Sequence, residues 1–243
     1  MNPRFSQGAL TAAVGRRGRW AAMALLACAL LLLVSLAASS NAAPKPPKVT
    51  VTLGHTSSEP DPSCPNLPCQ AVGSVTGFQV STDQNQSPFL VKTDGTIKSW
   101  TLTLAQPTNS QRNFFNGFFG TPPEARLAIL RRIAGTDPPR YNLRSQGSIH
   151  VLSPYLGQTV KFGAGLKVEK GDIVAITVPT WAPAFAQGLS ANNVWRASRE
   201  PGKCTNSTDV RQGEPHQKVG TRATYGCKYS TARLLYTVTV VED

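Results

Sequence analysis

Apolar residues follow two patterns along this chain: one continuous block near the N-terminus and, after it, short runs in which apolar and polar positions alternate. The block extends from Ala21 to Ala38, and its only hydroxyl side chain is Ser35. The alternating runs extend from Val49 to Val241. A period of two residues is typical of strands that bury one face. The pattern therefore predicts an apolar targeting or membrane segment followed by an all-β domain.

The clearest predicted strand is residues 98–104, in which Trp100, Leu102 and Leu104 would share one face. Residues 126–133 fit either a strand or a short helix. The turn residues Lys170-Gly171-Asp172 predict a tight hairpin between the strands on either side of them. About nine strands are expected, and the others are residues 49–53, 71–80, 148–152, 159–162, 166–168, 173–178 and 234–241.

These elements predict the fold class. Many short strands without a persuasive amphipathic helix favour an antiparallel β-sandwich, jelly-roll-like in topology, over an α/β enzyme core. A segment of about 200 residues can bury one sizeable core without a second domain. We therefore expect residues 49–243 to form one extracellular β-sandwich, joined to the apolar block by the Pro-rich linker of residues 39–48.

The apolar block, residues 21–38, predicts export. Residues 1–20 contain Arg16, Arg17 and Arg19 and form a basic n-region that stays in the cytoplasm. The small residues before Ala43 would permit cleavage, as in a signal peptide, whereas 18 residues would also serve as a single transmembrane helix. Under both interpretations the C-terminal domain is extracellular, either secreted or anchored to the membrane by an uncleaved N-terminal segment.

The cysteines fit an oxidising compartment. Cys64, Cys69, Cys204 and Cys227 follow the apolar block, and an even number suits two disulfides. Three pairings are possible. We favour Cys64 with Cys69, which closes a tight loop, and Cys204 with Cys227, which ties a polar insertion before the last strand. A four-cysteine zinc site is the alternative, but the spacing lacks paired Cys-x-x-Cys motifs.

Four segments together resemble a protein family: the cysteine loop ahead of a strand, the Trp100 strand, residues 166–178, and the run Trp195 to Arg199 before Cys204. They are similar to segments of uncharacterised secreted or membrane-anchored β-sandwich proteins of actinobacteria. The resemblance spans Val49 to Val241 and consists of turn and core signatures. It implies a β-sandwich and carries no assigned activity.

No catalytic or metal-binding motif is evident in the sequence. His55, His150 and His216 lie in unrelated segments without the spacing of metal ligands. A nucleophile elbow and a phosphate-binding Gly-rich loop are both missing. Most of the 13 acidic residues lie in turns or at the C-terminus, where solvated or capping roles are expected. We therefore expect no catalytic residues, no cofactor and no metal; a secreted hydrolase that assembles its site from distant segments is an alternative.

The net charge of the chain is +12, and residues 43–243 retain 21 basic against 13 acidic side chains, a net of +8. Such a balance favours anionic partners outside the cell, although a merely solvated basic surface would have the same composition. Candidate contacts come from two groups of arginines and include Arg131, Arg132, Arg196 and Arg199. Nucleic acid is not expected as a partner, because aromatic residues are not interleaved with the arginines.

Two aromatic segments add further candidates. Trp181, Phe185 and Trp195 would form a sugar-stacking platform if their flat faces were exposed; the alternative is that they close one end of the sandwich. Residues 114–119 place an Asn-Gly pair between two Phe pairs, which predicts a hairpin that either buries one Phe of each pair or presents an apolar tip.

Taken together, these features predict an exported, envelope-associated and non-catalytic β-sandwich whose partner is an acidic cell-wall polymer or glycan. A structural or assembly subunit of the cell surface is the second interpretation, and a secreted hydrolase is the third.

Overall fold

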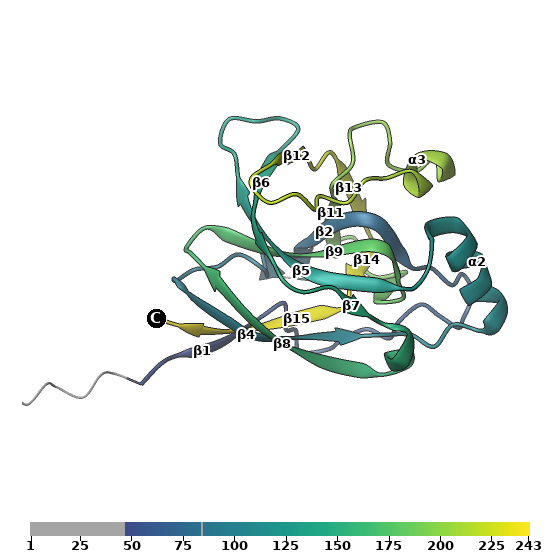
Figure 1. Ribbon diagram of the computed structural model, residues 1–243, viewed down its shortest axis with the longest axis horizontal. Coiled ribbons are helices and arrows are strands. Elements are labelled where there is room, and N and C mark those ends of the chain that lie inside the picture. Colours follow the sequence, from purple (N-terminus) through teal and green to yellow (C-terminus); the bar gives the residue numbers. More distant parts are fainter. Residues whose placement is uncertain (1–46, 84) are drawn as a thin grey trace, which may run out of the picture. The chain divides into compact units, whose positions relative to one another are not determined.

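The computed structural model describes residues 47–83 and 85–243, and their regular structure is mainly antiparallel sheet (Figure 1). The fold is therefore all-β, as the alternating pattern predicts. The expected n-region, the apolar block and most of the linker lie outside the described residues. Within those ranges, no helix combines the length and the apolar character that crossing a membrane requires.

The smaller of the two main sheets has four strands. Their order across the sheet is β1 (Thr50–Leu53), β15 (Tyr236–Glu242), β4 (Gly95–Thr103) and β8 (Thr159–Val168). All three pairings are antiparallel. The alternation predicted for the Trp100 strand is confirmed, because Trp100, Leu102 and Leu104 are all buried.

The larger sheet carries most of the remaining strands. Its path is β12 (Arg222–Thr224), β6 (Arg140–Gln146), β5 (Glu124–Arg132), β9 (Asp172–Ala182), β2 (Val72–Thr82), β11 (Val194–Ala197) and β13 (Cys227–Ser230). Two short strands pair beside this path, β3 (Asn85–Gln86) with β2 and β7 (His150–Val151) with β5. A separate ribbon pairs β10 (Phe185–Gln187) with β14 (Ala232–Leu234).

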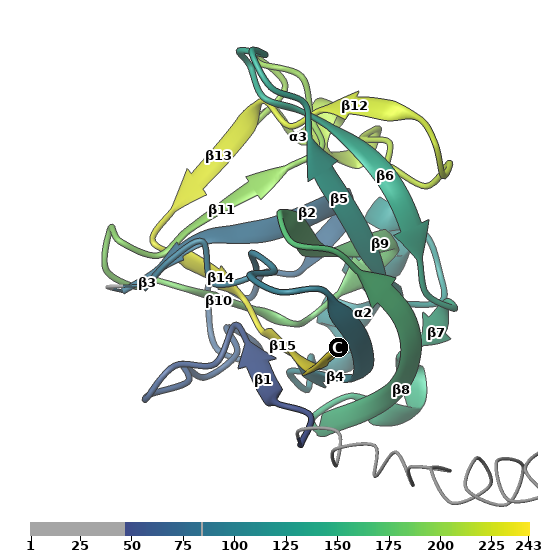
Figure 2. The same ribbon diagram turned by 90° about the vertical axis from the view of Figure 1, so that its left-hand side faces the viewer.

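The larger sheet buries apolar residues on both faces. One face packs on the four-stranded sheet and forms the main core with Trp100, Leu127 and Ile176. The other face carries a second cluster around Phe78, Tyr141 and Tyr225. In Figure 2 the sheet curls, so that β12 and β6 at one end approach β11 and β13 at the other. This curl encloses the second cluster.

Several predicted strands have different limits in the structure. Residues 126–132 belong to β5 and Ile133 follows it, so the segment is a strand, which resolves the ambiguity. The two runs expected at 159–162 and 166–168 form one continuous strand, β8, whereas residues 234–241 are divided between β14 and β15. Of residues 148–152 only β7 is strand, followed by the one-turn 3₁₀ helix η1 (Ser153–Tyr155).

The predicted hairpin at residues 114–119 is wrong. Those residues end the helix α2 (Asn109–Phe119). Thr108 caps this helix: its hydroxyl oxygen accepts from the Gln111 N–H, and the Gln111 side chain accepts from the Thr108 N–H at 2.8 Å. This reciprocal capping box offsets the turn preference of the Asn-Gly pair. The helix buries Phe115, and Phe114 stays 61% exposed.

The turn at Lys170-Gly171-Asp172 exists, but it is not a hairpin turn. It joins β8 of the smaller sheet to β9 of the larger sheet, so the chain crosses between layers here. Gly171 has φ of +89°, which favours glycine. The buried Asp172 carboxylate accepts the Glu169 N–H at 2.8 Å and pairs with Arg131 Nε, also at 2.8 Å. These contacts fix the crossing.

Two disulfide bonds each close a loop of the domain. Cys64 bonds to Cys69 and Cys204 bonds to Cys227, which is the pairing favoured by the loops they close. The second bond encloses the insertion that contains the short helix α3 (Ser207–Arg211). Both bonds are compatible with an extracellular location.

Candidate functional site

The three aromatic candidates are buried and do not form an exposed platform. Trp181 lies beneath α2, and its Nε1–H donates to Asn116 Oδ1 at 2.9 Å. Phe185 and Trp195 pack edge to face in the main core, with ring centroids 6.1 Å apart. Each ring is more than nine-tenths buried, so the three rings do not form a sugar-stacking platform. They pack inside the domain, which is closer to the alternative interpretation.

Arg131 belongs to an ion-pair network rather than to a free basic surface. Its Nε lies 2.8 Å from Asp172 Oδ1, and its Nη2 lies 3.4 Å from Glu169 Oε2. Arg144 contacts both oxygens of the same Glu169, at 2.6 and 2.8 Å. These hydrogen bonds, that of Arg144 first, lower the pKa of the Glu169 carboxyl. Arg131 therefore positions the β8–β9 crossing, and its expected role as a ligand contact stays a prediction.

Arg132 and Arg196, by contrast, come together in one cavity, which we call the arginine pocket. Arg132 ends β5, and its register partner on β6 is Tyr141. Arg196 lies on β11, where its register partner on β2 is Phe78. The curl of the larger sheet brings the Tyr141 ring against Phe78, with centroids 5.3 Å apart. The two arginines, 64 positions apart in sequence, thereby line the same cavity of about 420 Å³.

The electrostatics of the arginine pocket centre on Tyr141. Burial raises the pKa of the Tyr141 phenol, and the positive charges of Arg196 and Arg132 oppose that rise. Arg196 is held in place because its Nη1 donates to the Tyr225 carbonyl oxygen at 2.6 Å. Among the described residues no carboxylate lies within 4 Å of either guanidinium. The pocket is electropositive.

The lining of the arginine pocket fits binding better than catalysis. Two guanidinium groups and a phenol supply donors for a carboxylate or phosphate oxygen. Phe78, Phe89 and Ile173 supply apolar walls. Within the part of the chain that the structure describes, neither a histidine nor a carboxylate lines this cavity, so a general base is not placed beside a bound ligand.

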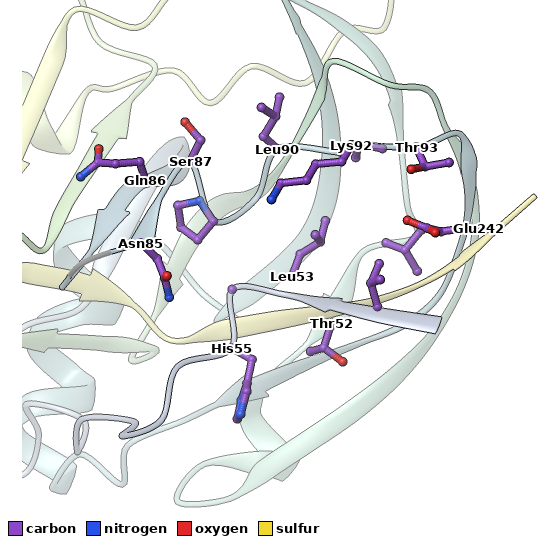
Figure 3. Close-up of a pocket in the computed structure, with 15 residues that line it drawn as sticks. Thr52, Leu53, His55, Asn85, Gln86, Ser87, Leu90, Lys92, Thr93 and Glu242 are labelled. Carbon is purple, nitrogen blue, oxygen red and sulfur yellow. The ribbon is translucent and has the colours of Figure 1, made fainter. Parts of the chain in front are cut away.

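A second concave region, of about 290 Å³, lies beside β1 (Figure 3). In Figure 3 Lys92 extends across the opening, Glu242 lies at one end, and the His55 ring points away beneath the strand. His55 is among the residues that line the groove, and its Nδ1 lies 3.8 Å from Glu59 Oε1. The groove thus combines one lysine amine with the Glu242 carboxylate, which makes it a weaker anion site than the two guanidinium groups of the arginine pocket.

The remaining histidines have structural surroundings. His150 stacks on Phe162 with centroids 4.1 Å apart, and burial lowers its pKa. His216 is buried, with Nε2 3.0 Å from Thr221 Oγ1 and Nδ1 3.3 Å from the Tyr225 hydroxyl. The described ranges contain no group of three or more His, Cys, Asp or Glu side chains placed to hold a metal ion.

Arg199, the last candidate, lies in a different cleft from Arg132 and Arg196 and is 7% exposed. Sequence reasoning found these arginines but missed Tyr141, because residues 140–146 were not expected to form a strand, and missed Phe78, because the curl that brings β2 to β6 joins strands far apart in the chain. The alternation of Tyr141 and Leu143 with polar residues was the available signal.

Comparison with known proteins adds no relative to this picture. The chain matches no family model, no curated protein and no solved structure.

Proposed function

We propose that this protein is an exported, envelope-associated binding module that holds an anionic group of an extracellular polymer in its arginine pocket. The polymer class that fits is an acidic cell-wall glycan, whose carboxylates or phosphates repeat along the chain. The proposal includes the jelly-roll-like topology, the relationship to the actinobacterial proteins, and export by the apolar block, either cleaved or retained as a membrane anchor.

One observation carries the proposal: Arg132 and Arg196 meet at Tyr141 without a carboxylate partner among the described residues. Arg131 and Arg144, by comparison, are paired with carboxylates at the β8–β9 crossing. Arg132 and Arg196 lie beside the same phenol, and Arg196 is held there by its hydrogen bond to the Tyr225 carbonyl oxygen, so both can donate to one anionic group. Charge-assisted hydrogen bonds of this kind are about twice as strong as neutral ones.

The location and composition support an extracellular polymer as the partner. Two disulfides suit an oxidising compartment. The net charge of +8 after residue 42 would raise the local concentration of a polyanion around the domain. Phe78, Phe89 and Ile173 would contact the less polar parts of a sugar ring.

The experiment is sedimentation of the purified, disulfide-bonded protein with isolated cell wall across a salt series. We expect binding that falls steeply between low and physiological salt, because exposed charges are screened over about 8 Å at physiological ionic strength. Arg132→Gln and Arg196→Gln should each weaken binding. Arg211→Gln is the matched control, since this exposed arginine on α3 does not line the pocket.

Three outcomes would contradict the proposal. Wall binding that is unchanged by both Arg132→Gln and Arg196→Gln would show that the wall contacts another part of the protein. An absence of binding at every salt concentration would favour an assembly role, to be followed by measuring self-association. Release of soluble wall fragments by the wild-type protein would favour the interpretation as a secreted hydrolase.

A further inference from the structure

A further cleft, of about 300 Å³, lies where β2 begins, next to β13 and the Cys204–Cys227 insertion. It is distinct from the arginine pocket and from the groove beside β1. Its walls include Phe119, Phe185, Trp195 and Tyr229, and its charged residue is Arg199. We call it the Arg199 cleft. It shares no lining residue with the arginine pocket, so its properties can be tested separately.

The guanidinium of Arg199 is held firmly by neutral groups. Its Nη1 donates to the Tyr229 hydroxyl at 2.9 Å, and its Nη2 donates to the Gly73 carbonyl oxygen at 2.9 Å. The Tyr229 hydroxyl in turn donates to the Cys204 carbonyl oxygen at 2.7 Å. Arginine has five N–H donors. Two are engaged here, and Nε is buried without a partner.

The unusual feature is a buried positive charge without a counterion. Arg199 is 7% exposed, and in residues 47–83 and 85–243 no carboxylate lies within 4 Å of it. Among the described residues Arg233 is the other deeply buried arginine, and it pairs with Glu59 at 3.0 Å. Buried charges are normally paired, because removing a charge from water is costly. An anion in the cleft would supply the missing partner of Arg199.

The aromatic walls of the cleft indicate that such an anion would have an apolar part. Trp195 stacks on Tyr229 with ring centroids 4.5 Å apart, and Phe185 packs edge to face on Trp195. The Trp195 Nε1–H is buried and has no acceptor in the described structure. The cleft therefore combines a fixed cation with an aromatic lining in a cavity the size of a small-molecule site.

From this geometry we propose that the Arg199 cleft binds a small organic carboxylate with a flat or apolar body. The carboxylate oxygens accept hydrogen bonds from free N–H groups of Arg199. The apolar body lies against the walls formed by Phe119, Phe185 and Trp195. The Arg199 cleft recognises one carboxylate and the apolar body attached to it, whereas the arginine pocket would bind a repeating polyanion. The two proposals are independent of each other.

The test is isothermal titration of the purified, disulfide-bonded protein with benzoate, benzamide, acetate and inorganic phosphate. Benzoate should bind saturably, and benzamide, which has the same ring without the charge, should bind roughly tenfold more weakly or worse. Acetate and phosphate should also bind more weakly, because they lack the apolar body. Equal affinities for benzoate and benzamide, equal affinities for benzoate and phosphate, or no saturable benzoate binding would each overturn the proposal. In the last case Arg199 would be a structural clasp between β2 and β13.

Three variants locate the site. Arg199→Met should abolish benzoate binding. Because that change also removes two hydrogen bonds, Ser230→Leu provides a second test: it enlarges an exposed side chain at the cleft and leaves Arg199 intact. A folded Ser230→Leu protein with undiminished benzoate affinity would contradict the proposal. Arg132→Gln should leave benzoate affinity unchanged, and a loss there would assign benzoate to the arginine pocket.

Discussion

Tyr141 on β6 packs edge to face against Phe78 on β2, with ring centroids 5.3 Å apart, although β5 and β9 separate those two strands in the sheet. A flat sheet would keep them three strand spacings apart, roughly 14 Å. The contact therefore measures how strongly the larger sheet curls. The same curl brings Arg132 and Arg196 into one pocket, so packing and the candidate site depend on one feature.

Substitutions of Tyr141 should separate these two roles. Tyr141→Ala removes a buried ring that contacts Phe78 and Tyr225, and we expect it to lower the free energy of unfolding by about 3 kcal/mol. Tyr141→Phe keeps the ring and removes the hydroxyl, so it should weaken wall binding with little change in stability. Urea unfolding and wall sedimentation measure the two effects. A Tyr141→Phe protein that binds wall like the wild type would show that the phenol is not a ligand contact.

The sequence predicts well those features that depend on local periodicity. Trp100 and Leu102 are buried because burying one face of a strand imposes a period of two. Local sequence signals did not predict which strands pair, because contacts between residues far apart in the chain determine the pairing. Lys170-Gly171-Asp172 is a turn, as expected, but turn residues do not determine whether the following strand pairs with its predecessor. In α2, the capping box at Thr108 prevails over the Asn-Gly preference.

The candidate site illustrates the same limit. Arg131 and Arg132 are neighbours with the same chemistry, but adjacent strand residues point to opposite faces of the sheet. Arg131 meets Asp172, and Arg132 lines the arginine pocket. The sequence contains both charges and the alternation. It does not contain the curl that brings Arg196 to Arg132, since this follows from the pairing of strands far apart in the chain.

Arg131 should matter for stability and not for binding. Asp172 is 2% exposed and receives hydrogen bonds from Arg131 Nε and the Glu169 N–H. Asp172→Asn should therefore lower the free energy of unfolding by about 2 kcal/mol, because it weakens charge-assisted bonds to a buried group. Arg131→Gln should also destabilise the protein, yet leave wall binding unchanged. Parallel unfolding and sedimentation assays check both statements, and weakened wall binding by a folded Arg131→Gln protein would restore Arg131 as a ligand contact.

The two disulfides should contribute unequally to stability. Replacing Cys204 and Cys227 by alanine opens a loop with a sequence separation of 23, and the chain-entropy model gives a loss of roughly 3 kcal/mol. Replacing Cys64 and Cys69 opens a separation of only 5, for which the same model gives roughly 2 kcal/mol. Denaturant unfolding of the two double variants measures the difference. Equal losses would contradict the loop-length argument.

Loss of the Cys204–Cys227 bond should also affect the Arg199 cleft. The Cys204 carbonyl oxygen accepts the Tyr229 hydroxyl, which in turn accepts from Arg199. We therefore expect the Cys204→Ala, Cys227→Ala protein to bind benzoate more weakly than the wild type while it is still folded. The Cys64→Ala, Cys69→Ala protein is the comparison, because neither of those cysteines lines the cleft. Equal benzoate affinities for the two double variants would contradict this prediction.

The last prediction concerns acid stability and His216. Burial lowers the pKa of this imidazole below its ordinary 6.5, while its hydrogen bond to the Thr221 carbonyl opposes that shift. The folded protein therefore prefers neutral His216, and the unfolded chain takes up a proton first as the pH falls. Stability should be fully present above pH 6.5 and should decline as the pH falls from there through the folded-state pKa.

His216→Gln removes this titration, so its free energy of unfolding should depend less on pH between about 7.5 and 5 than that of the wild type. The variant should be less stable overall at neutral pH, because His216 bridges Thr221 and Tyr225. Burial also lowers the pKa of His150, so His150→Gln, made separately, isolates that residue's share of the slope. Urea unfolding at a series of pH values measures all three proteins. Identical slopes for the wild type and His216→Gln would mean that folding does not lower the pKa of His216.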